Sequence, residues 1–334
     1  MDLFAGIGGF HIGMASVGGT CVFASECDTF ARITYEYHFK KNNSGLFLNG
    51  NFNRNIHDVD TNTIPDFNVL CAGFPCQPFS AAGLKMGFAD TRGTLFFRIA
   101  SIINTKKKCG SPPKVLLLEN VKGLRGHDKG RTLKKIIHVL NTLDYTVCLK
   151  VINTRHFGIP QNRDRLFIVA WLNNTKSRNE FIFPLGLDRN NNPIFDEKQL
   201  SFKSKPVKVG DILCAKVDEK YTISDRLYKG HIRRLLKHRK KGNGFGFSLF
   251  NESSPYTNTI SARYYKDGSE ILIKQKNKNP RKLSPEEAGR LQGYPINEGF
   301  TIVVSDFQAY KQFGNSVSIP VVKTIAKEIV RQIL

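Results

Sequence analysis

Residues 2–9 read DLFAGIGG, a short apolar run that passes into three glycines. This order predicts a short strand, a glycine-rich turn and a helix, because glycines let the backbone approach a ligand and a helix start offers unpaired amides. Glu26 follows Gly6 by twenty residues and ends the next apolar run. In a doubly wound sheet, an acidic residue at this position can hydrogen-bond the ribose hydroxyls of a bound nucleoside. The dinucleotide fingerprint is incomplete, since His11 stands at its third glycine position. The motif predicts a nucleoside-type cofactor site, with a purely structural tight turn as the alternative.

The first half of the chain alternates strand-like and helix-like stretches. Continuous apolar strands separated by helices indicate a mostly parallel sheet covered on both faces, an α/β fold. Residues 146–153 and 165–171 follow without a clear helix between them and favour an antiparallel pair. The other expected strands are residues 21–26, 68–75 and 115–120, and the expected helices are residues 28–39, 93–105 and 130–143.

Length and composition narrow the function. The 334 residues predict roughly two domains. Lys plus Arg number 50 against 28 Asp plus Glu, and the net charge of +22 favours a polyanionic partner, either nucleic acid or an anionic membrane surface. No apolar run approaches the roughly 18 residues of a membrane span, and Met1 is followed at once by an acid, which is unlike a signal peptide. Seven scattered cysteines without a CxxC pair predict free thiols in a reducing compartment and no zinc site.

The rhythm of strands and helices is lost between residues 173 and 280. This third of the chain carries 22 basic and 11 acidic residues, which is half of the surplus charge. Residues 225–241 end in HIRRLLKHRKK and predict a helix whose charges bind phosphates, with a solvated basic face as the alternative. Further helices are expected over residues 282–291 and 319–333.

A cysteine loop follows one of the expected strands. Residues 73–80 read GFPCQPFS and place Cys76 at the carboxyl edge of the sheet, where ligands bind in open sheets. A thiolate is a strong nucleophile there if its pKa is lowered or a base is near, and the sequence leaves open which applies. Cys71 lies inside the strand and is expected to be a buried, inert thiol.

Further polar groups are expected at the same edge. Glu119, in LENV, ends another apolar strand, and partial desolvation there favours the protonated carboxyl group; a helix cap or an ion pair is the alternative. Arg163 and Arg165, in QNRDR, share one face of an extended segment. Two guanidinium groups on one face suit a phosphate or a carbonyl oxygen, and a solvated basic strand start is the alternative.

Together these segments resemble the cytosine-C5 DNA methyltransferase family of bacterial restriction–modification systems. The resemblance covers nearly the whole chain and keeps the family's motif order. The motifs read DLFAGIGGF, GFPCQPFS with DTRGTLFF after it, ENV, QNRDRLFIVAW, RKLSPEEAGRLQGYP and QFGNSVSIPVV. The resemblance implies a Rossmann-like S-adenosylmethionine-dependent methyltransferase fold, mostly parallel with an antiparallel strand, plus a smaller, largely β target-recognition domain.

The implied reaction is methyl transfer from S-adenosylmethionine to carbon 5 of a flipped-out cytosine within a short duplex DNA sequence, with S-adenosylhomocysteine as product and no metal. By resemblance, Cys76 adds to carbon 6, Glu119 holds the base at its N3 and amino edge, and Arg165 contacts the base. Arg163 completes this catalytic set as a backbone or positioning contact. The target must leave the duplex, because a stacked base cannot lie between the thiol and the cofactor.

The resemblance also assigns binding residues. Glu26 is expected at the ribose hydroxyls, Asp58 at the adenine amino group, and Arg263 is a candidate for reading guanine in the major groove. The full cofactor set is Phe4, Gly6, Ile7, Gly8, Gly9, Glu26, Cys27, Asp58, Val59, Gly73, Pro75, Leu95, Asn315, Ser316 and Val317. The expected DNA contacts are Gln77, Ser80, Arg92, Gln161, Arg233, Arg234, Lys237, Arg239, Lys240 and Arg263.

The domain limits follow from the same motifs. Residues 1–180 and 313–334 are expected to form the catalytic, cofactor-binding domain, residues 181–279 the recognition domain and residues 280–312 a hinge. We expect a monomer in the cytoplasm, associated with the nucleoid through DNA and not with a membrane. A cognate restriction endonuclease in the same system is expected, and it need not be a physical partner.

Three alternatives compete with this interpretation. A tRNA cytosine-C5 methyltransferase has a related fold, but the basic, separate recognition region favours DNA. A catalytically silent DNA-binding accessory protein is disfavoured by the intact set of Cys76, Glu119 and Arg165. A nicotinamide oxidoreductase using the Gly6 turn is disfavoured by His11 and leaves the Cys76 loop unexplained.

Overall fold

The computed structural model describes residues 1–48, 50–75, 95–173, 180–244 and 246–334. Four predicted site residues, Cys76, Gln77, Ser80 and Arg92, lie outside the described residues. The chain divides into two compact units. Unit 1 comprises Met1–Ile152, Asp164–Leu185 and Val321–Leu334, and unit 2 comprises Asn153–Arg163 and Gly186–Pro320. Residues 153–163 and 280–320 thus group with the region for which the sequence predicted target recognition.

Unit 1 is built on a central sheet whose order, among the described residues, is β3-β2-β1-β4-β5-β7-β6. The strands from β3 to β5 pair in parallel, and β7 runs antiparallel to β5. The predicted α/β fold, with a mostly parallel sheet and an antiparallel strand, is therefore confirmed. The bounds are β1 (Asp2–Leu3), β2 (Ala24–Ser25), β3 (Phe52–Asn53), β4 (Val69–Gly73), β5 (Val115–Val121), β6 (Tyr145–Asn153) and β7 (Asp164–Leu172).

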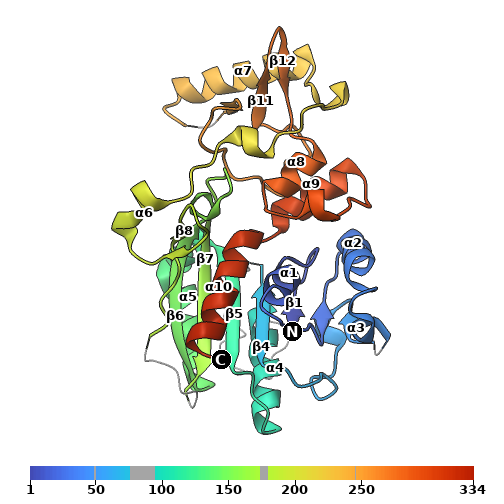
Figure 1. The fold of residues 1–334 in the computed structure, drawn as a ribbon, viewed down its shortest axis with the longest axis vertical. Helices are drawn as coiled ribbons and strands as arrows, with labels where there is room; N and C mark the ends of the chain where they lie inside the picture. The colour runs from blue at the N-terminus through green and yellow to red at the C-terminus, as the bar shows by residue number, and fades with distance from the viewer. Residues whose placement is uncertain (49, 76–94, 174–179, 245) are drawn as a thin grey trace. The chain divides into compact units, whose positions relative to one another are not determined.

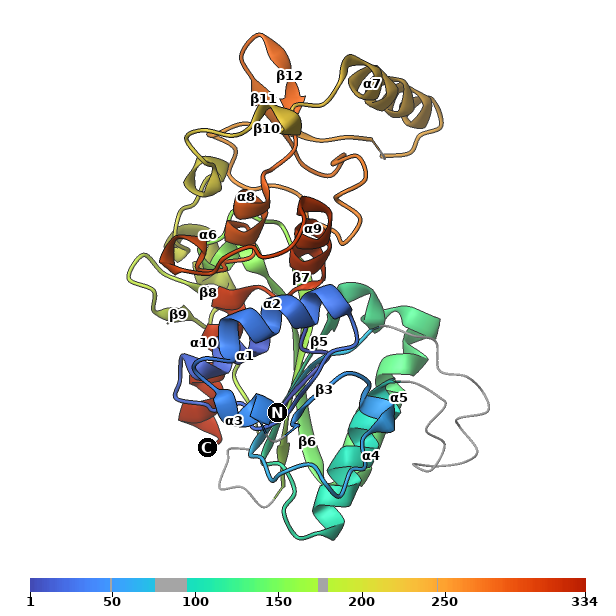
Figure 2. The ribbon, with the colours of Figure 1, turned by 90° about the vertical axis from the view of Figure 1, so that its right-hand side faces the viewer.

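Helices cover both faces of this sheet (Figures 1 and 2). Figure 2 views the sheet nearly along its plane, with α4 and α5 on one face and α1, α2 and α10 on the other. The structure confirms three expected helices, over residues 28–39, 130–143 and 319–333. It also confirms the described part of the helix expected over residues 93–105. The bounds are α1 (Gly9–Ala15), α2 (Thr29–Phe39), α3 (Ser44–Leu48), α4 (Leu95–Lys108), α5 (Arg131–Thr142) and α10 (Ile319–Gln332).

The core of unit 1 lies along the central strands. The side chains of Val115, Leu116, Leu117 and Leu118 on β5 are all fully buried, as expected for a strand covered on both faces. Strand β1 has only two residues and pairs with β2 on one side and β4 on the other, so its neighbours hold it in place. The resulting sheet carries the turn that follows β1 at its carboxyl edge.

The sequence predicted a largely β domain over residues 181–279, whereas the described helices of this stretch contain more residues than its strands. The predicted helix over residues 225–241 is present as α7, whereas α9 was not predicted. The helices of unit 2 are α6 (Glu197–Lys203), α7 (Asp225–Lys240), α8 (Pro285–Arg290) and α9 (Asp306–Asn315). The strands are β8 (Gly186–Leu187), β9 (Pro193–Ile194), β10 (Leu249–Phe250), β11 (Leu272–Gln275) and β12 (Lys278–Arg281). Among the described residues, no helix is long and apolar enough to cross a membrane.

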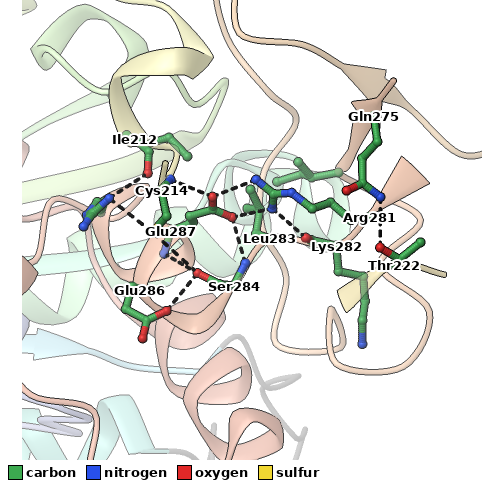
Figure 3. Close-up of polar contacts among 12 residues, drawn as sticks. Ile212, Cys214, Thr222, Gln275, Arg281, Lys282, Leu283, Ser284, Glu286 and Glu287 are labelled. Atoms are coloured by element: carbon green, nitrogen blue, oxygen red, sulfur yellow. Dashed lines mark hydrogen bonds and ion pairs between the residues drawn. The ribbon is translucent and has the colours of Figure 1, made fainter. Parts of the chain in front are cut away.

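A buried ion pair fixes the start of α8 (Figure 3). The Arg281 guanidinium donates to both carboxylate oxygens of Glu287, at 2.7 and 2.8 Å. The backbone N–H groups of Cys214 and Ser284 donate to the same carboxylate, each at 2.8 Å. Ser284 also caps the helix, since its hydroxyl accepts from the Glu287 N–H. One carboxylate therefore joins three segments of unit 2.

Candidate active site

An arginine–carboxylate pair lies at the carboxyl edge of the unit 1 sheet. Glu119 is near the end of β5 and Arg165 is near the start of β7, and these antiparallel strands pair Val121 with Arg165. The Nε atom of Arg165 lies 3.1 Å from Oε1 of Glu119, and their side chains are only 18% and 12% exposed. The fold thus brings together two side chains that the sequence predicted to be catalytic.

The same edge carries the end of β4. Gly73 pairs with Glu119 in the parallel register, and a Cβ built on Gly73 would lie 3.8 Å from Oε2 of Glu119. The Asn120 side-chain amide donates to the carbonyl oxygen of Phe74 at 2.8 Å and so ties the exit of β4 to β5. Gly73 precedes Cys76 by three residues in the sequence. The segment that leads to the cysteine therefore starts beside the Glu119–Arg165 pair.

The glycine turn after β1 is held by Glu26. Its Oε2 atom accepts from the Gly6 N–H at 2.8 Å, and Oε1 accepts from the Asp28 N–H at 2.7 Å. Gly6 has a φ of +55°, and no atom lies within 4 Å of a Cβ built on it. Gly8 differs, because a Cβ there would meet the Phe39 ring at 2.2 Å. The turn is open at Gly6, whereas Gly8 serves packing.

Apolar side chains border this edge. Phe4, Val59 and Leu95 are partly buried and pack against the core of unit 1. Asp58 is exposed at the end of the short 3₁₀ helix Ile56–Asp58. Of the other predicted cofactor residues in unit 1, Ile7 and Gly9 are buried, and Cys27 and Pro75 are exposed.

Arg98 is a supporting residue that the sequence analysis missed. It lies on α4, is 7% exposed, and donates through Nε to the Ile56 carbonyl at 2.9 Å and through Nη2 to the Val59 carbonyl. These two carbonyls flank Asp58, so Arg98 fixes the loop that presents it. The available signal was a charged residue inside the apolar run LFFRIASII.

Arg163 and Gln161 lie inside unit 2. The Arg163 guanidinium donates to three backbone carbonyls and is buried. The fully buried Gln161 amide donates to the Leu291 carbonyl at 2.7 Å and accepts from the Ile260 N–H at 3.0 Å. Arg163 directly precedes β7, which begins at Asp164, and Arg165 is the second residue of that strand. The two guanidinium groups bond within different units.

The remaining predicted residues lie in unit 2. Asn315, the last residue of α9, is exposed, and after the helix Ser316 is partly buried and Val317 is buried. Arg234 forms an ion pair with Asp267 at 3.0 Å. The basic residues of unit 2 that are predicted to contact DNA are exposed; these are Arg233, Arg234, Lys237, Arg239, Lys240 and Arg263. Within the described ranges, no group of three or more His, Cys, Asp and Glu side chains is arranged to hold a metal ion.

A largely parallel sheet with a glycine turn, an acid and an arginine–carboxylate pair at its carboxyl edge is typical of α/β enzymes, which bind their ligands at that edge. The family model described as C-5 cytosine-specific DNA methylase matches residues 1–331. The chain belongs to this family, and the resemblance found in the motifs is confirmed.

Curated relatives match nearly the whole chain. Type II methyltransferase M.SsoII of Shigella sonnei is 52% identical over 99% of this chain and 79% of its own length. Type II methyltransferase M.DsaV of Dactylococcopsis salina is 48% identical over 100% of this chain and 86% of its own. The solved structure of a Spodoptera frugiperda DNMT2 mutant has a TM-score of 0.74 at 20% identity, covering 99% of this chain and 98% of that one. At that identity, the structural match shows the fold alone.

Proposed function

We propose that this protein is a DNA (cytosine-5-)-methyltransferase and the modification enzyme of a type II restriction–modification system. It converts cytosine in duplex DNA to 5-methylcytosine and leaves S-adenosylhomocysteine. The family match over residues 1–331 and the type II relatives at 48% and 52% identity support this function. The tRNA alternative has less support, because these relatives are named as type II methyltransferases.

The reaction needs a nucleophile, since carbon 5 of cytosine is itself a weak one. The Cys76 thiolate adds to carbon 6, and the resulting electron-rich ring attacks through carbon 5. S-adenosylmethionine supplies the methyl group as an electrophilic sulfonium. A base then takes the proton from carbon 5, the bond between carbon 6 and sulfur breaks, and the ring double bond is restored with release of the thiolate.

The Glu119–Arg165 pair carries the proposal. The 3.1 Å contact orients the carboxyl group, and its position beside Gly73 places it at the start of the segment that leads to Cys76. In the proposed role, Glu119 holds the N3 and amino edge of the cytosine, and Arg165 supports the base. A fixed carboxyl–guanidinium pair needs no reorganisation when charge develops on the ring.

The glycine turn fits the nucleoside part of S-adenosylmethionine. The open space at Gly6 permits close approach to the backbone. Glu26 is proposed to take the ribose hydroxyls and Asp58 the adenine amino group. Phe4, Val59 and Leu95 offer partly buried apolar surface for an adenine ring. The contacts of Ile7, Gly8, Gly9, Cys27, Gly73, Pro75, Asn315, Ser316 and Val317 are proposed from the family resemblance.

Unit 2 is proposed to read the DNA sequence. Its exposed basic side chains on α7 suit phosphates, and Arg263 is the candidate for a base contact. The proposed setting is a cytoplasmic monomer acting beside a cognate restriction endonuclease.

Methylome sequencing of a methylation-deficient host that expresses the chain tests the function. We expect 5-methylcytosine at one short sequence, and methylation of tRNA in place of duplex DNA would overturn the proposal. A duplex with 5-fluorocytosine at the target should then trap a covalent complex with the wild-type protein. Cys76→Ala should trap none, while Cys71→Ala is the matched control and should still trap. Trapping by Cys76→Ala would show that the nucleophile is misassigned.

A further inference from the structure

We infer that Arg163 is a positioning residue that couples DNA recognition to cofactor binding. It joins the segment before Arg263 to the Asn315–Val317 segment, and we call this connection the Arg163 joint. The joint consists of Arg163, residues 260–262 and residues 314–316, all in unit 2. The inference rests on the proposed function, which assigns Arg263 to DNA and residues 315–317 to the cofactor.

The first observation is the set of partners of Arg163. Its Nη1 donates to the Ile260 carbonyl at 3.1 Å. Its Nη2 donates to the Gly314 carbonyl at 3.2 Å and to the Ser316 carbonyl at 2.6 Å. One rigid guanidinium therefore bridges two segments that are far apart in the sequence. Its fork geometry fixes the angles of these bonds, which a flexible ammonium group would not.

The second observation is the contact at Gly314. A Cβ built there would lie 2.3 Å from the Ser261 carbonyl carbon and 2.4 Å from the Ala262 nitrogen. The backbone at the end of α9 therefore packs directly on the 261–262 peptide, and nothing larger than glycine fits. A movement of one segment must displace the other, because both sides of the contact are backbone.

The third observation is that both sides of the joint are braced. Gln161 accepts from the Ile260 N–H at 3.0 Å on the recognition side. On the other side, the Tyr294 and Ser316 hydroxyls are 2.5 Å apart, and the Gln292 amide donates to the Phe313 carbonyl at 2.6 Å. Gln161, Gln292 and Tyr294 are all buried. Water therefore does not compete for these hydrogen bonds. A movement of the 260–262 segment should then shift residues 314–316 rather than break the bonds between them.

The electrostatics favour the same arrangement. The last carbonyls of a helix have no partner within it and carry partial negative charge. Gly314 lies in the last turn of α9, and Ser316 follows the helix directly. Arg163 thus satisfies the end of α9 while its other arm holds Ile260. If DNA contact at Arg263 moves the 260–262 segment, the helix end and the 315–317 segment move with it.

The test measures the affinity for S-adenosylhomocysteine by calorimetry, with and without a duplex that contains the methylated sequence. The ratio of the two dissociation constants is the coupling factor, and linkage requires the same factor for DNA affinity with and without S-adenosylhomocysteine. We expect about fivefold or more coupling in the wild-type protein. In Arg163→Lys and Gly314→Ala the factor should fall to within about twofold of one.

Two matched variants serve as controls. Gly230→Ala is made where a Cβ meets nothing within 4 Å, and Arg290→Lys changes another arginine of unit 2 that donates to a backbone carbonyl. Both should keep the wild-type coupling factor. Loss of coupling in these controls would overturn the inference, because a general disturbance of unit 2 would then explain the result.

The outcomes separate this inference from the proposed function. Wild-type protein that methylates DNA but shows a factor near one overturns the joint alone, and so do folded Arg163→Lys and Gly314→Ala variants with wild-type coupling. Protein that neither binds S-adenosylhomocysteine nor methylates DNA overturns both proposals. If both variants fail to fold, Tyr294→Phe decides, since it removes only the Tyr294 hydroxyl that contacts the Ser316 hydroxyl. An unchanged factor in Tyr294→Phe then overturns the joint, and a reduction of about threefold or more supports it.

Discussion

Removing the charge of Glu287 should destabilise unit 2 strongly. The carboxylate accepts four hydrogen bonds, two from the Arg281 guanidinium and two from the backbone N–H groups of Cys214 and Ser284 (Figure 3). Glu287→Gln keeps the volume but turns an NH₂ group toward donors and leaves the buried Arg281 cation without a counter-charge. Removing one partner of a buried ion pair costs about 3–5 kcal/mol.

The loss of stability can be measured as a decrease in the melting temperature of the protein. For a unit of this size, about 4 kcal/mol corresponds to a fall in Tm of about 10 °C, which differential scanning calorimetry resolves. Glu286→Gln is the matched control, because Glu286 is exposed and should change the free energy of unfolding by less than about 0.5 kcal/mol. The double variant Arg281→Met/Glu287→Gln should be no less stable than Glu287→Gln, since it removes the uncompensated cation. A loss below about 1 kcal/mol for Glu287→Gln would refute the reasoning.

Three further predictions concern unit 1. Glu119→Gln should lower kcat by about 10²–10⁴-fold in a methyl-transfer assay, with the calorimetric affinity for S-adenosylhomocysteine unchanged, and a smaller effect would contradict its role. Asp28→Ala should reduce the free energy of unfolding in urea by about 1 kcal/mol, because the Asp28 carboxylate caps α2 through the N–H groups of Phe30 and Ala31; Asp28→Asn should retain most of it. Burial lowers the pKa of His11 to about 4. The contribution of His11 to the free energy of unfolding should therefore fall by about 3 kcal/mol as the pH drops from about 6.5 to 4, and the difference in stability between the wild-type protein and His11→Gln should change by that amount.

The sheet and most of the helices were predictable because their signal is local. The apolar run of β5 is buried throughout Val115–Leu118, and α5 has its buried residues on one face. Helix α9 was missed because its sequence DFQAYKQFGN mixes polar residues into the buried face, where Gln312 is only 8% exposed. In unit 2, α7 was predicted from its sequence, whereas the short, polar helix α6 was not.

The position of a candidate site residue was predictable where the residue lies at the end of a strand. Glu119 ends an apolar strand, and such ends meet at one edge of a parallel sheet, but the register that pairs it with Arg165 depends on an antiparallel strand further along the chain. The surroundings of Arg163 could not be read locally, because its partners Ile260 and Ser316 lie 97 and 153 residues away. The role of Arg98 was not predicted for the same reason, because its partner Val59 lies 39 residues away in the sequence.

The division at the bond between Arg163 and Asp164 affects how specificity could be exchanged between related enzymes. A chimera that grafts only residues 181–279 would bring in the donor's residues at positions 260–262. These would then pack against Arg163 and Gly314 of the host, which fit the host's own 260–262 segment. A graft that also carries residues 153–163 and the chain up to Pro320 keeps those contacts intact. Shuffled libraries cut at the unit boundaries should therefore yield more active hybrids than libraries cut at residues 181 and 279.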